Sequence, residues 1–388
     1  MSLSARWTEV LDGLRGQGRY RSLRPPVGID FTSNDYLGYR GGDTQSPPVA
    51  TGGLSSPLTT HHSPLTTSHS GTSSRLLRGH HPVWDAVESA LAGWHGAEAV
   101  LMMTSGYAAN EGLISTVIEP DDWVATDALN HASIIDGLRL CRPRKFVFRH
   151  NDLDHLETGL RAEAGRRPAG RAMFVITESL FSMDGDRAPL PDIVGLAERY
   201  GAHVIVDEAH ATGCFGPAGS GCVDAAGLRG RVLATVHTGG KALGVPGAYV
   251  CGSKLLREYL VNRCRHLIFT TALPPAVGAW WQEAIARVKE DDEGRRLLHE
   301  NAAAFRAALA ASGVAAGGSE YVVPVVFGDD GRAVRAAARL QRLGFDVRAI
   351  RPPSVPPGTA RVRISVHADH DPAVLARLAA AVGEAVRA

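Results

Sequence analysis

Short apolar runs, separated by segments with helical periodicity, recur through the middle of the chain and constrain its fold more than any other feature. The runs are AVLMM (99–103), KFVF (145–148), AMFVIT (172–177), HVIVD (203–207) and AYVCG (248–252). Runs of this length are typical of strands. Strands that alternate with helices build a mostly parallel sheet. The pattern therefore predicts a large α/β domain built on such a sheet.

The segment PLPDIVGLAERYG (189–201) is the clearest of the predicted helices. The residues that share one helical face are Ile193, Leu196, Ala197 and Tyr200. Pro191 stands early in the segment and Gly201 stands at its end. Proline is favoured in the first turn of a helix and glycine just after the last. We therefore predict a helix that connects two strands of the sheet.

The last part of the chain has a different order of elements. Segments 331–350, 361–368 and 371–388 together have the pattern helix, strand, strand, helix, which is typical of a smaller α+β domain. We predict three parts: an N-terminal segment (1–40), a large domain (41–280) and a small C-terminal domain (281–388).

Composition excludes several classes of function. The chain has 388 residues, 44% of them hydrophobic, so it can bury a large core. A net charge of +1 provides no electrostatic footprint for nucleic acid or an anionic membrane. The N-terminus lacks the apolar core of a signal peptide, and the five scattered cysteines form no CxxC pair. We expect a cytoplasmic enzyme that acts on small molecules.

Residues 41–73 interrupt the pattern of strands and helices. The sequence SPLTT occurs twice, at 56–60 and 63–67, in a stretch rich in serine, threonine, proline and histidine. Such a composition predicts an irregular loop. His61, His62 and His69 lie there without a cysteine or acidic neighbour, so we predict no metal site.

Lys241 lies in the stretch VHTGGKALGVPG (236–247) and is one of only four lysines among 41 basic residues. Lysine can lose its proton and attack a carbonyl carbon, whereas the guanidinium group of arginine stays charged. A Schiff base at Lys241 is therefore possible. A Walker A loop is excluded because Thr235 stands where its first glycine would be and Ala242 where its serine or threonine would be.

Other residues fit the needs of a pyridoxal 5'-phosphate (PLP) site around that lysine. Asp207 ends an apolar run and could pair with the pyridine nitrogen of the cofactor. Gly106 and Tyr107 follow a strand and begin a helical segment, where backbone amides bind phosphate well. His131 follows another strand and could stack on a flat ring. Each residue alone also has an ordinary structural explanation, and the combination is what favours PLP.

The chain resembles the α-oxoamine synthases from about residue 28 to its end. The segments that carry the resemblance are SNDYLGY (33–39), SRLLRGHHPVWDAVESALAGWHGAEAVLMMTSGYAAN (74–110), NHASIIDG (130–137), TESLFSMDGDRAPL (177–190), VDEAHATG (206–213), TGGKALG (238–244), FTTALPP (269–275) and RPPSVPPGTARVR (351–363). The resemblance implies a PLP-dependent transferase of fold type I, like aspartate aminotransferase, with a mostly parallel seven-stranded sheet in its large domain. Such an enzyme would condense an amino acid with an acyl thioester. The resemblance also implies a homodimer that shares its active sites.

The resemblance assigns roles by motif match. The catalytic residues would be Lys241, His131, Asp207 and His210. The PLP-binding residues would be Gly106, Tyr107, His131, Ser182, Asp207, His210, Thr238, Lys241, Thr270 and Thr271, with the last two contributed across the dimer interface. The substrate-binding residues would be Asn34, Ser354, Arg351, Arg361 and Arg363. Which of the three arginines binds the substrate carboxylate stays open at this point.

Segment 351–363 most resembles the members that join L-alanine to pimeloyl-CoA or a pimeloyl-carrier protein in biotin synthesis, although Ser354 stands where a threonine is usual. Residues 70–75 depart from the family pattern near the expected thioester entrance, so the acyl donor is the part of the resemblance most in question. The alternatives are a member that uses glycine or serine, an aminotransferase or aldolase of the same fold, and an inactive binding protein.

Overall fold

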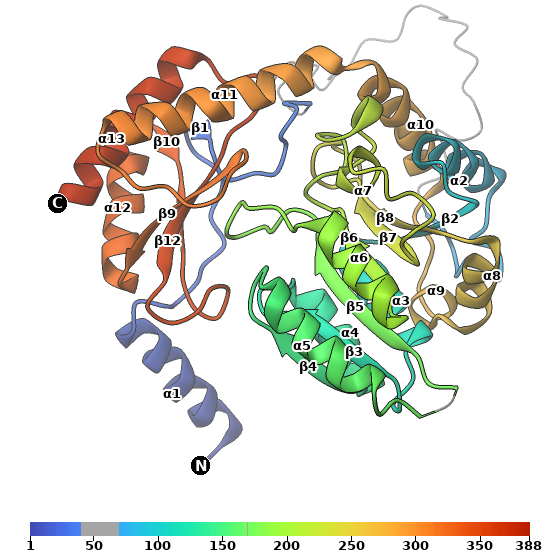
Figure 1. The fold of residues 1–388 in the computed structure, drawn as a ribbon. Helices are drawn as coiled ribbons and strands as arrows, with labels where there is room; N and C mark the ends of the chain where they lie inside the picture. The colour runs from blue at the N-terminus through green and yellow to red at the C-terminus, as the bar shows by residue number, and fades with distance from the viewer. Residues whose placement is uncertain (40–69, 169) are drawn as a thin grey trace, which may run out of the picture. The chain divides into compact units, whose positions relative to one another are not determined.

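The computed structural model describes residues 1–39, 70–168 and 170–388 (Figure 1). Most of the segment for which we predict an irregular loop, including His61, His62 and His69, lies outside the described residues.

Packing divides the chain into two compact units. The large unit comprises residues 37–181 and 187–295, and the small unit comprises residues 1–36, 182–186 and 296–388. The predicted division into 1–40, 41–280 and 281–388 stays a prediction, because packing alone does not show which parts fold independently.

A seven-stranded sheet forms the centre of the large unit, with the strand order β2-β8-β7-β6-β5-β3-β4. Its strands are β2 (Ala99–Met103), β3 (Trp123–Asp127), β4 (Arg144–Phe148), β5 (Met173–Glu178), β6 (His203–Asp207), β7 (Ala234–Thr238) and β8 (Ala248–Gly252). Only β8 runs antiparallel to its neighbours. The predicted mostly parallel sheet is confirmed. Strands β2, β6 and β8 have the predicted bounds. Strand β4 begins one residue earlier than predicted, and β5 begins and ends one residue later.

Helices cover both faces of this sheet. They are α2 (Pro82–His95), α3 (Gly106–Val117), α4 (Ala132–Cys141), α5 (Leu153–Ala164), α6 (Leu190–Tyr200), α7 (Cys222–Ala225), α8 (Lys254–Arg263), α9 (Arg265–Ile268) and α10 (Pro275–Glu290), with a short 3-10 turn η2 (Pro217–Gly219). Ile176 of β5 packs in a core with α3 and α4, whereas its neighbour Val175 packs in a second core with α5 and α6. Successive strand residues point to opposite faces, so an apolar run supplies both cores.

Helix α6 shows how its sequence determines its bounds. Pro191 lies in its first turn, and Gly201 ends it with a φ of 69°, a conformation that glycine adopts without strain. Ile193 and Ala197 are fully buried against the sheet. The predicted helix is therefore confirmed (Figure 1).

The small unit has an antiparallel three-stranded sheet with the order β11-β12-β9. Its strands are β9 (Val322–Gly328), β11 (Arg348–Ile350) and β12 (Ala360–Ser365), and a separate parallel pair joins β1 (Ile29–Asp30) to β10 (Phe345–Asp346). Its helices are α1 (Leu3–Gly16), α12 (Asp330–Arg342) and α13 (Pro372–Arg387), and α11 (Asp292–Ala311) carries the chain from the large unit into the small one. Helix α12 packs on β9, β12 and α13, as expected of an α+β layer.

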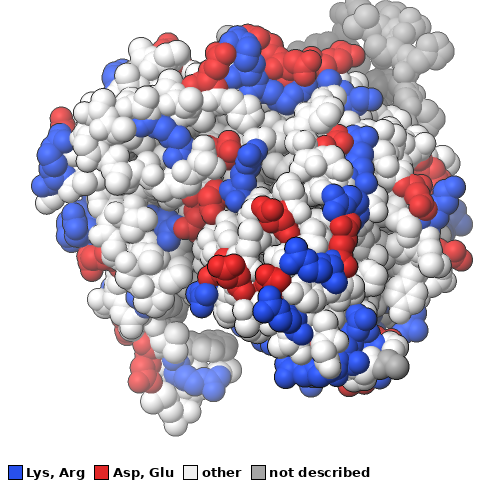
Figure 2. All heavy atoms as spheres, in the orientation of Figure 1, with Lys and Arg blue, Asp and Glu red and all other residues white. Residues whose placement is uncertain are grey.

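The surface charge is mixed. Lys and Arg side chains are interspersed with Asp and Glu side chains over the face that Figure 2 shows, which agrees with the net charge of +1. Among the described residues, no helix is both long enough and apolar enough to cross a membrane.

Candidate active site

The carboxyl ends of neighbouring parallel strands bring several polar residues to one edge of the large sheet. Strand β6 ends at Asp207, which lies in register with Glu178 at the end of β5. Strand β7 ends at Thr238, three residues before Lys241. Ligands of open parallel sheets bind beyond this edge. The edge is therefore the candidate site.

Asp207 is a buried carboxylate held by neutral donors. The side-chain amide of Asn110 donates to Oδ2 of Asp207 at 2.6 Å, and the backbone N–H of Ala209 donates to Oδ1 at 2.8 Å. Both of these donors are uncharged, and a cation beside a buried carboxylate offsets the cost of its burial. The site therefore favours a cation beside Asp207, such as a protonated ring nitrogen.

His131 lies at the start of α4 with a fixed orientation. The backbone N–H of Ser133 donates to Nδ1 of His131, and the Ser133 hydroxyl lies 2.8 Å from the same nitrogen. A neutral His131 ring therefore carries its proton on Nε2. Burial lowers the pKa of His131, and the nearby charge of Lys241 lowers it further while Asp207 opposes the effect. Asn110 also donates to Ser133, which links His131 to Asp207.

Lys241 lies in a tight turn after β7. A Cβ atom at Gly239 would lie 2.5 Å from the Trp281 ring and 2.5 Å from the backbone oxygen of Val245, so no other residue fits there. The backbone N–H of Gly244 donates to the Lys241 carbonyl oxygen at 3.0 Å and closes the turn. The positive charge of Lys241 affects the pKa of both His131 and Glu178, so its amine lies within electrostatic reach of both.

Glu178 is a residue of this edge that the sequence analysis missed. Its side chain is buried, and Oε1 has no hydrogen-bond partner among the described residues. Burial and the neighbouring charge of Asp207 raise the pKa of Glu178 well above the ordinary carboxyl value. Glu178 therefore tends to keep its proton beside Asp207. Its place at the end of the apolar run 172–177 was the signal that could have identified it.

The start of α3 provides an anion-binding position. Ser105 caps this helix, accepting a hydrogen bond from the backbone N–H of Ala108 at 3.2 Å. Gly106 is the first helical residue, and a Cβ atom there would lie 3.5 Å from the Thr238 side chain. Backbone amides and the helix dipole favour phosphate at such a position. Gly106 and Thr238, predicted to bind the same phosphate, are thus brought together.

The remaining predicted residues of the large unit occupy varied positions. The Tyr107 ring meets His131 edge-on at a centroid distance of 6.0 Å, and its hydroxyl donates to Asp136. His210 is buried in the turn that follows β6. Thr271 is exposed and forms an isolated bridge with Ser74, and Thr270 precedes it.

In the small unit, Arg363 and Asn34 are in direct contact. Arg363 is only 7% exposed, and its guanidinium donates to Oδ1 of Asn34 at 2.9 Å and to the Ser182 carbonyl oxygen at 2.6 Å. Its other partners are the hydroxyls of Tyr36 and Ser365. All these partners are uncharged.

The other two predicted arginines differ from Arg363. Arg361 forms an ion pair with Asp184 at 2.7 Å, so its charge is compensated within the unit. Arg351 is half-buried and donates to the Gly18 carbonyl oxygen. Ser354 is exposed and accepts a hydrogen bond from Arg21 at 3.3 Å.

The residues at the strand edge fit PLP. Lys241 supplies an amine, Asp207 a buried anion for the ring nitrogen, His131 a flat ring, and the start of α3 a phosphate position. The buried carboxylate of Asp207, held by two uncharged donors, is the strongest of these observations, because a protonated pyridine supplies a cation beside it.

Comparisons with known proteins agree with this fit. A model of the family "Aminotransferase class I and II" matches residues 27–382. The 8-amino-7-oxononanoate synthase of Chlorobaculum parvum is 41% identical over 370 residues, which cover 92% of each chain. Serine palmitoyltransferase from S. paucimobilis, solved with a PLP–myriocin aldimine, has a TM-score of 0.85 at 29% identity and covers 100% of this chain and 99% of its own. The 8-amino-7-oxononanoate synthase of Francisella tularensis has a TM-score of 0.72 at 24% identity, covering 93% and 98% of the two chains, and supports the fold.

These findings confirm the resemblance, the fold and the cofactor predicted from the sequence. The protein is a PLP-dependent acyltransferase of fold type I. The chain belongs to the class I and II aminotransferase family, and within it to the α-oxoamine synthases.

Proposed function

We propose that the chain condenses L-alanine with a pimeloyl thioester to form 8-amino-7-oxononanoate, CO2 and a free thiol, a step of biotin biosynthesis. The observation that carries the proposal is that Lys241, Asp207 and His131 lie close together at the carboxyl edge of the large sheet. This arrangement suits PLP-dependent carbanion chemistry. The choice of alanine and of a pimeloyl group is supported by the 41% identity to the synthase of Chlorobaculum parvum.

The proposed roles of the cofactor-binding residues come from the family resemblance, and the positions of Asp207, Gly106 and Thr238 support them. Bound PLP would supply an electron sink, because its protonated ring accepts the electron pair left when a bond to the substrate α-carbon breaks. Asp207 would accept the hydrogen bond of the ring nitrogen, and His131 would lie against the ring face. Gly106 and Thr238 would contact the phosphate, and His210 and Ser182 would approach the ring oxygen, with Tyr107 nearby.

Lys241 would act both as the covalent tether of the cofactor and as the proton carrier. Its neutral Nζ takes the proton from the α-carbon of alanine as a general base. That carbon then attacks the thioester carbonyl and the thiol leaves. After the carboxylate has left as CO2, the protonated Nζ returns a proton to the same carbon. Loss of Lys241 therefore removes two functions at once.

We propose Arg363 as the arginine that holds the substrate carboxylate. It is buried among uncharged partners, so its positive charge is uncompensated within the small unit. A buried cation of this kind favours an incoming anion. The planar guanidinium matches a carboxylate, and Asn34 lies beside it. Arg361 is less suited because Asp184 already neutralises it.

We also propose a homodimer with Thr270 and Thr271 near the partner's phosphate site. Large apolar side chains are exposed close to these residues in the sequence: Phe269 is 70% exposed. Leu77, near the Ser74 bridge partner of Thr271, is 76% exposed. Exposed apolar side chains of this size are typical of interfaces.

A cytoplasmic location remains part of the proposal. All five cysteines are free and buried, which suits a reducing compartment.

A serine-specific reaction with a longer acyl group is the second candidate. It is favoured by the TM-score of 0.85 with serine palmitoyltransferase over the full chain. The two candidates share every residue proposed for PLP, so the cofactor site cannot separate them. A same-fold aminotransferase would share Lys241 and Asp207 but release no thiol.

The test is thiol release and product mass with purified PLP-loaded protein. L-alanine, glycine and L-serine are each combined with pimeloyl-CoA and with palmitoyl-CoA, and Lys241→Ala is the inactive control. Alanine with pimeloyl-CoA is expected to give the most thiol and a product of the mass of 8-amino-7-oxononanoate. A preference for serine with palmitoyl-CoA would overturn the proposal in favour of the second candidate. Transfer of the amino group without thiol release would show an aminotransferase.

A further inference from the structure

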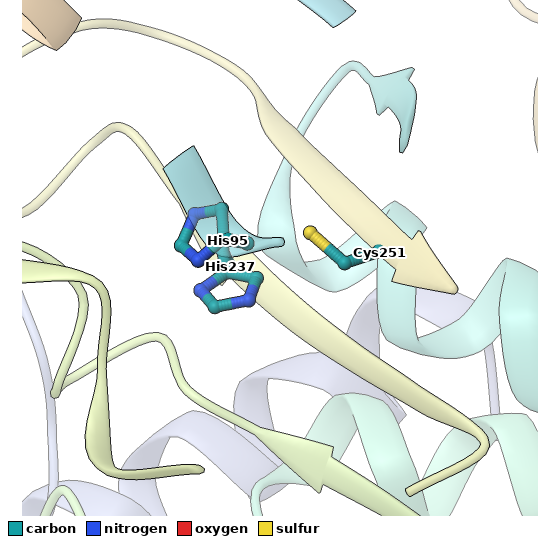
Figure 3. A group of neighbouring side chains, drawn as sticks. All are labelled: His95, His237 and Cys251. Carbon is teal, nitrogen blue, oxygen red and sulfur yellow. The ribbon is translucent and has the colours of Figure 1, made fainter. Parts of the chain in front are cut away.

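A second cluster of polar side chains lies in the large unit and takes no part in the proposed reaction. His95 ends α2, His237 lies on β7 and Cys251 lies on β8 (Figure 3). All three residues are buried, and one donor atom from each lies within 4.8 Å of the others. His237 and its neighbour Thr238 point to opposite faces of the sheet, as successive strand residues do. The cluster is therefore separated from the phosphate position by the sheet itself.

Strand register explains why these side chains meet. Strands β7 and β8 are antiparallel, with Thr235 opposite Cys251 and His237 opposite Tyr249. Residues at every second position share a face, so all four side chains lie on one side of the sheet. Figure 3 shows the His95 ring over the His237 ring, with the Cys251 sulfur directed toward the pair. The two ring centroids are 4.2 Å apart.

The hydrogen bonds of His237 define which of its nitrogens has a lone pair. The Thr212 hydroxyl donates its only hydrogen to the Glu208 carbonyl oxygen at 2.8 Å. It must therefore accept from Nδ1 of His237, which lies 2.8 Å away. The His237 ring is buried, and a neutral ring with its proton on Nδ1 has its lone pair on Nε2. Nε2 then carries the lone pair and faces the Thr235 hydroxyl at 2.7 Å.

His95 has the same tautomer for a similar reason. A ring N–H of His95 donates to the Ser220 backbone. Nε2 lies 2.8 Å from the Tyr249 hydroxyl, which leaves Nδ1 as the donor to Ser220. The His95 ring is also buried, and a neutral ring with its proton on Nδ1 has its lone pair on Nε2. Its Nε2 lone pair also faces a hydroxyl that can rotate.

This pattern matches the way that metal-binding histidines are held. Such a histidine usually donates its second ring N–H to a carbonyl or another acceptor, which fixes the ring and its tautomer. Here Ser220 and Thr212 are those acceptors. The Nε2 lone pairs of His95 and His237 face the hydroxyls of Tyr249 and Thr235, and these hydroxyls can rotate away. Cys251 adds sulfur, which together with two imidazoles suits zinc and similar ions.

A cavity gives access to the cluster. It has a volume of about 270 Å³ and is lined by His95, His237 and Cys251. Its lining also includes Gly96 and Gly230, which are exposed, so it reaches the surface. The carboxyl group of Glu208 lines the same cavity and adds an acidic group near the cluster. There is thus room for the ion and for a water in a fourth position.

We propose that His95, His237 and Cys251 form a binding site for a thiophilic transition-metal dication such as Zn²⁺. The two Nε2 atoms and the Cys251 sulfur are the ligands, with the cavity open at the fourth position. On binding, the S–H bond of Cys251 breaks, a sulfur–metal bond forms and the proton passes to solvent. The ring planes, now tilted by 35°, turn so that both lone pairs meet the ion.

A second group, His367, Asp369 and His370, shows the contrast. Nδ1 of His370 accepts from the His367 backbone N–H at 3.0 Å, and its Nε2 lies 2.9 Å from the Asp30 carbonyl oxygen. Both nitrogens of His370 are therefore held by backbone groups, which cannot rotate away as a hydroxyl can. We assign no metal to this group.

The test is titration of untagged, PLP-loaded protein with Co²⁺, followed by displacement with Zn²⁺. We expect one Co²⁺ per chain, visible d–d bands of tetrahedral intensity, a thiolate charge-transfer band and release of one proton. Cys251→Ser should abolish the charge-transfer band and weaken binding more than tenfold. Cys141→Ser is the matched control, because Cys141 is also buried but bonds only to helix carbonyls. It should bind Co²⁺ like the wild type.

A second variant tests the positioning of the ligands. Thr212→Val removes the acceptor that holds Nδ1 of His237 and should weaken metal binding by roughly 10–100-fold while the d–d bands persist. The PLP absorbance of each variant reports that the fold is intact. Absence of stoichiometric binding, or a Cys251→Ser titration identical to that of the wild type, would overturn the proposal.

Discussion

At the residue scale, two buried ionisable side chains held by uncharged donors or acceptors stand out, Asp207 in the large unit and Arg363 in the small unit. Asp207 is held by the amide of Asn110 and a backbone N–H, and Arg363 is held by uncharged groups. Motifs in the sequence pointed to Asp207, and to Arg363 only as one of three candidate arginines. They did not identify Asn110 or Glu178, because the importance of each depends on a partner distant in the sequence, Asp207, and only strand register and helix packing bring them together.

Replacement of Asn110 tests the support of Asp207. Asn110→Ala removes a hydrogen bond to a charged group, which is typically worth about 1.5–3 kcal/mol. We expect PLP affinity to fall by about 10–100-fold, measured by titration of the cofactor-free protein. Asn262→Ala is the control, because the Asn262 side chain bonds only to a carbonyl of its own helix. Equal PLP affinity in both variants would contradict the role of Asn110.

Replacement of Glu178 tests its protonation. Its pKa is raised in the folded protein, so above the ordinary carboxyl value of about 4.3 the folded state binds more protons than the unfolded state. Stability contributed by Glu178 is therefore lost as pH rises from that value through the raised pKa. We expect the melting temperature of cofactor-free Glu178→Gln to increase relative to wild type as pH rises. A difference independent of pH would show that Glu178 is not protonated.

At the scale of elements, the sequence predicted best those strands whose bounds depend on a local pattern of apolar residues. Strands β6 and β8 have the predicted bounds because each is one uninterrupted apolar run. Strands β3 and β7 carry polar residues such as Thr126 and His237, so they do not stand out as apolar runs. The tautomer of His237 depends on Thr212 in the turn after β6, and its ring contacts depend on α2 and β8. No pattern within β7 predicts these partners.

The turn that presents Lys241 gives a prediction at this scale. In Gly239→Ala the new Cβ would contact the Trp281 ring and the Val245 carbonyl oxygen, so the turn must shift. We expect a loss of stability of about 1–3 kcal/mol and reduced PLP occupancy. In Gly195→Ala, on α6, the Cβ meets nothing within 4 Å, and a gain of about 0.5–1 kcal/mol is expected. Melting temperature measures the stability of both variants, and PLP absorbance measures their cofactor content. A Gly239→Ala variant with the melting temperature and PLP content of the wild type would contradict the account of the turn.

At the scale of the whole molecule, composition gave the net charge, but it could not indicate assembly. The exposed side chains of Phe269 and Leu77 became visible only in the fold. Assembly depends on which apolar residues remain uncovered, and this is a property of tertiary structure.

The proposed dimer gives a prediction at the same scale. Phe269→Glu places a charge on an apolar surface that we expect to be buried between subunits, so the dimer should dissociate at least tenfold more readily. Sedimentation velocity measures the change. Leu343→Glu, at another exposed leucine in the small unit, is the comparison and should leave assembly unchanged. A monomeric wild type would contradict the proposal directly.

The central claim is that Lys241, among the four lysines, holds PLP at the strand edge. The most direct measurement is reduction of the PLP-loaded protein with borohydride, followed by digestion and mass spectrometry of the peptides. The account predicts a phosphopyridoxyl group on the peptide that contains Lys241 and on no other. A label on Lys145, Lys254 or Lys289, or no label on a protein that retains PLP, would contradict it.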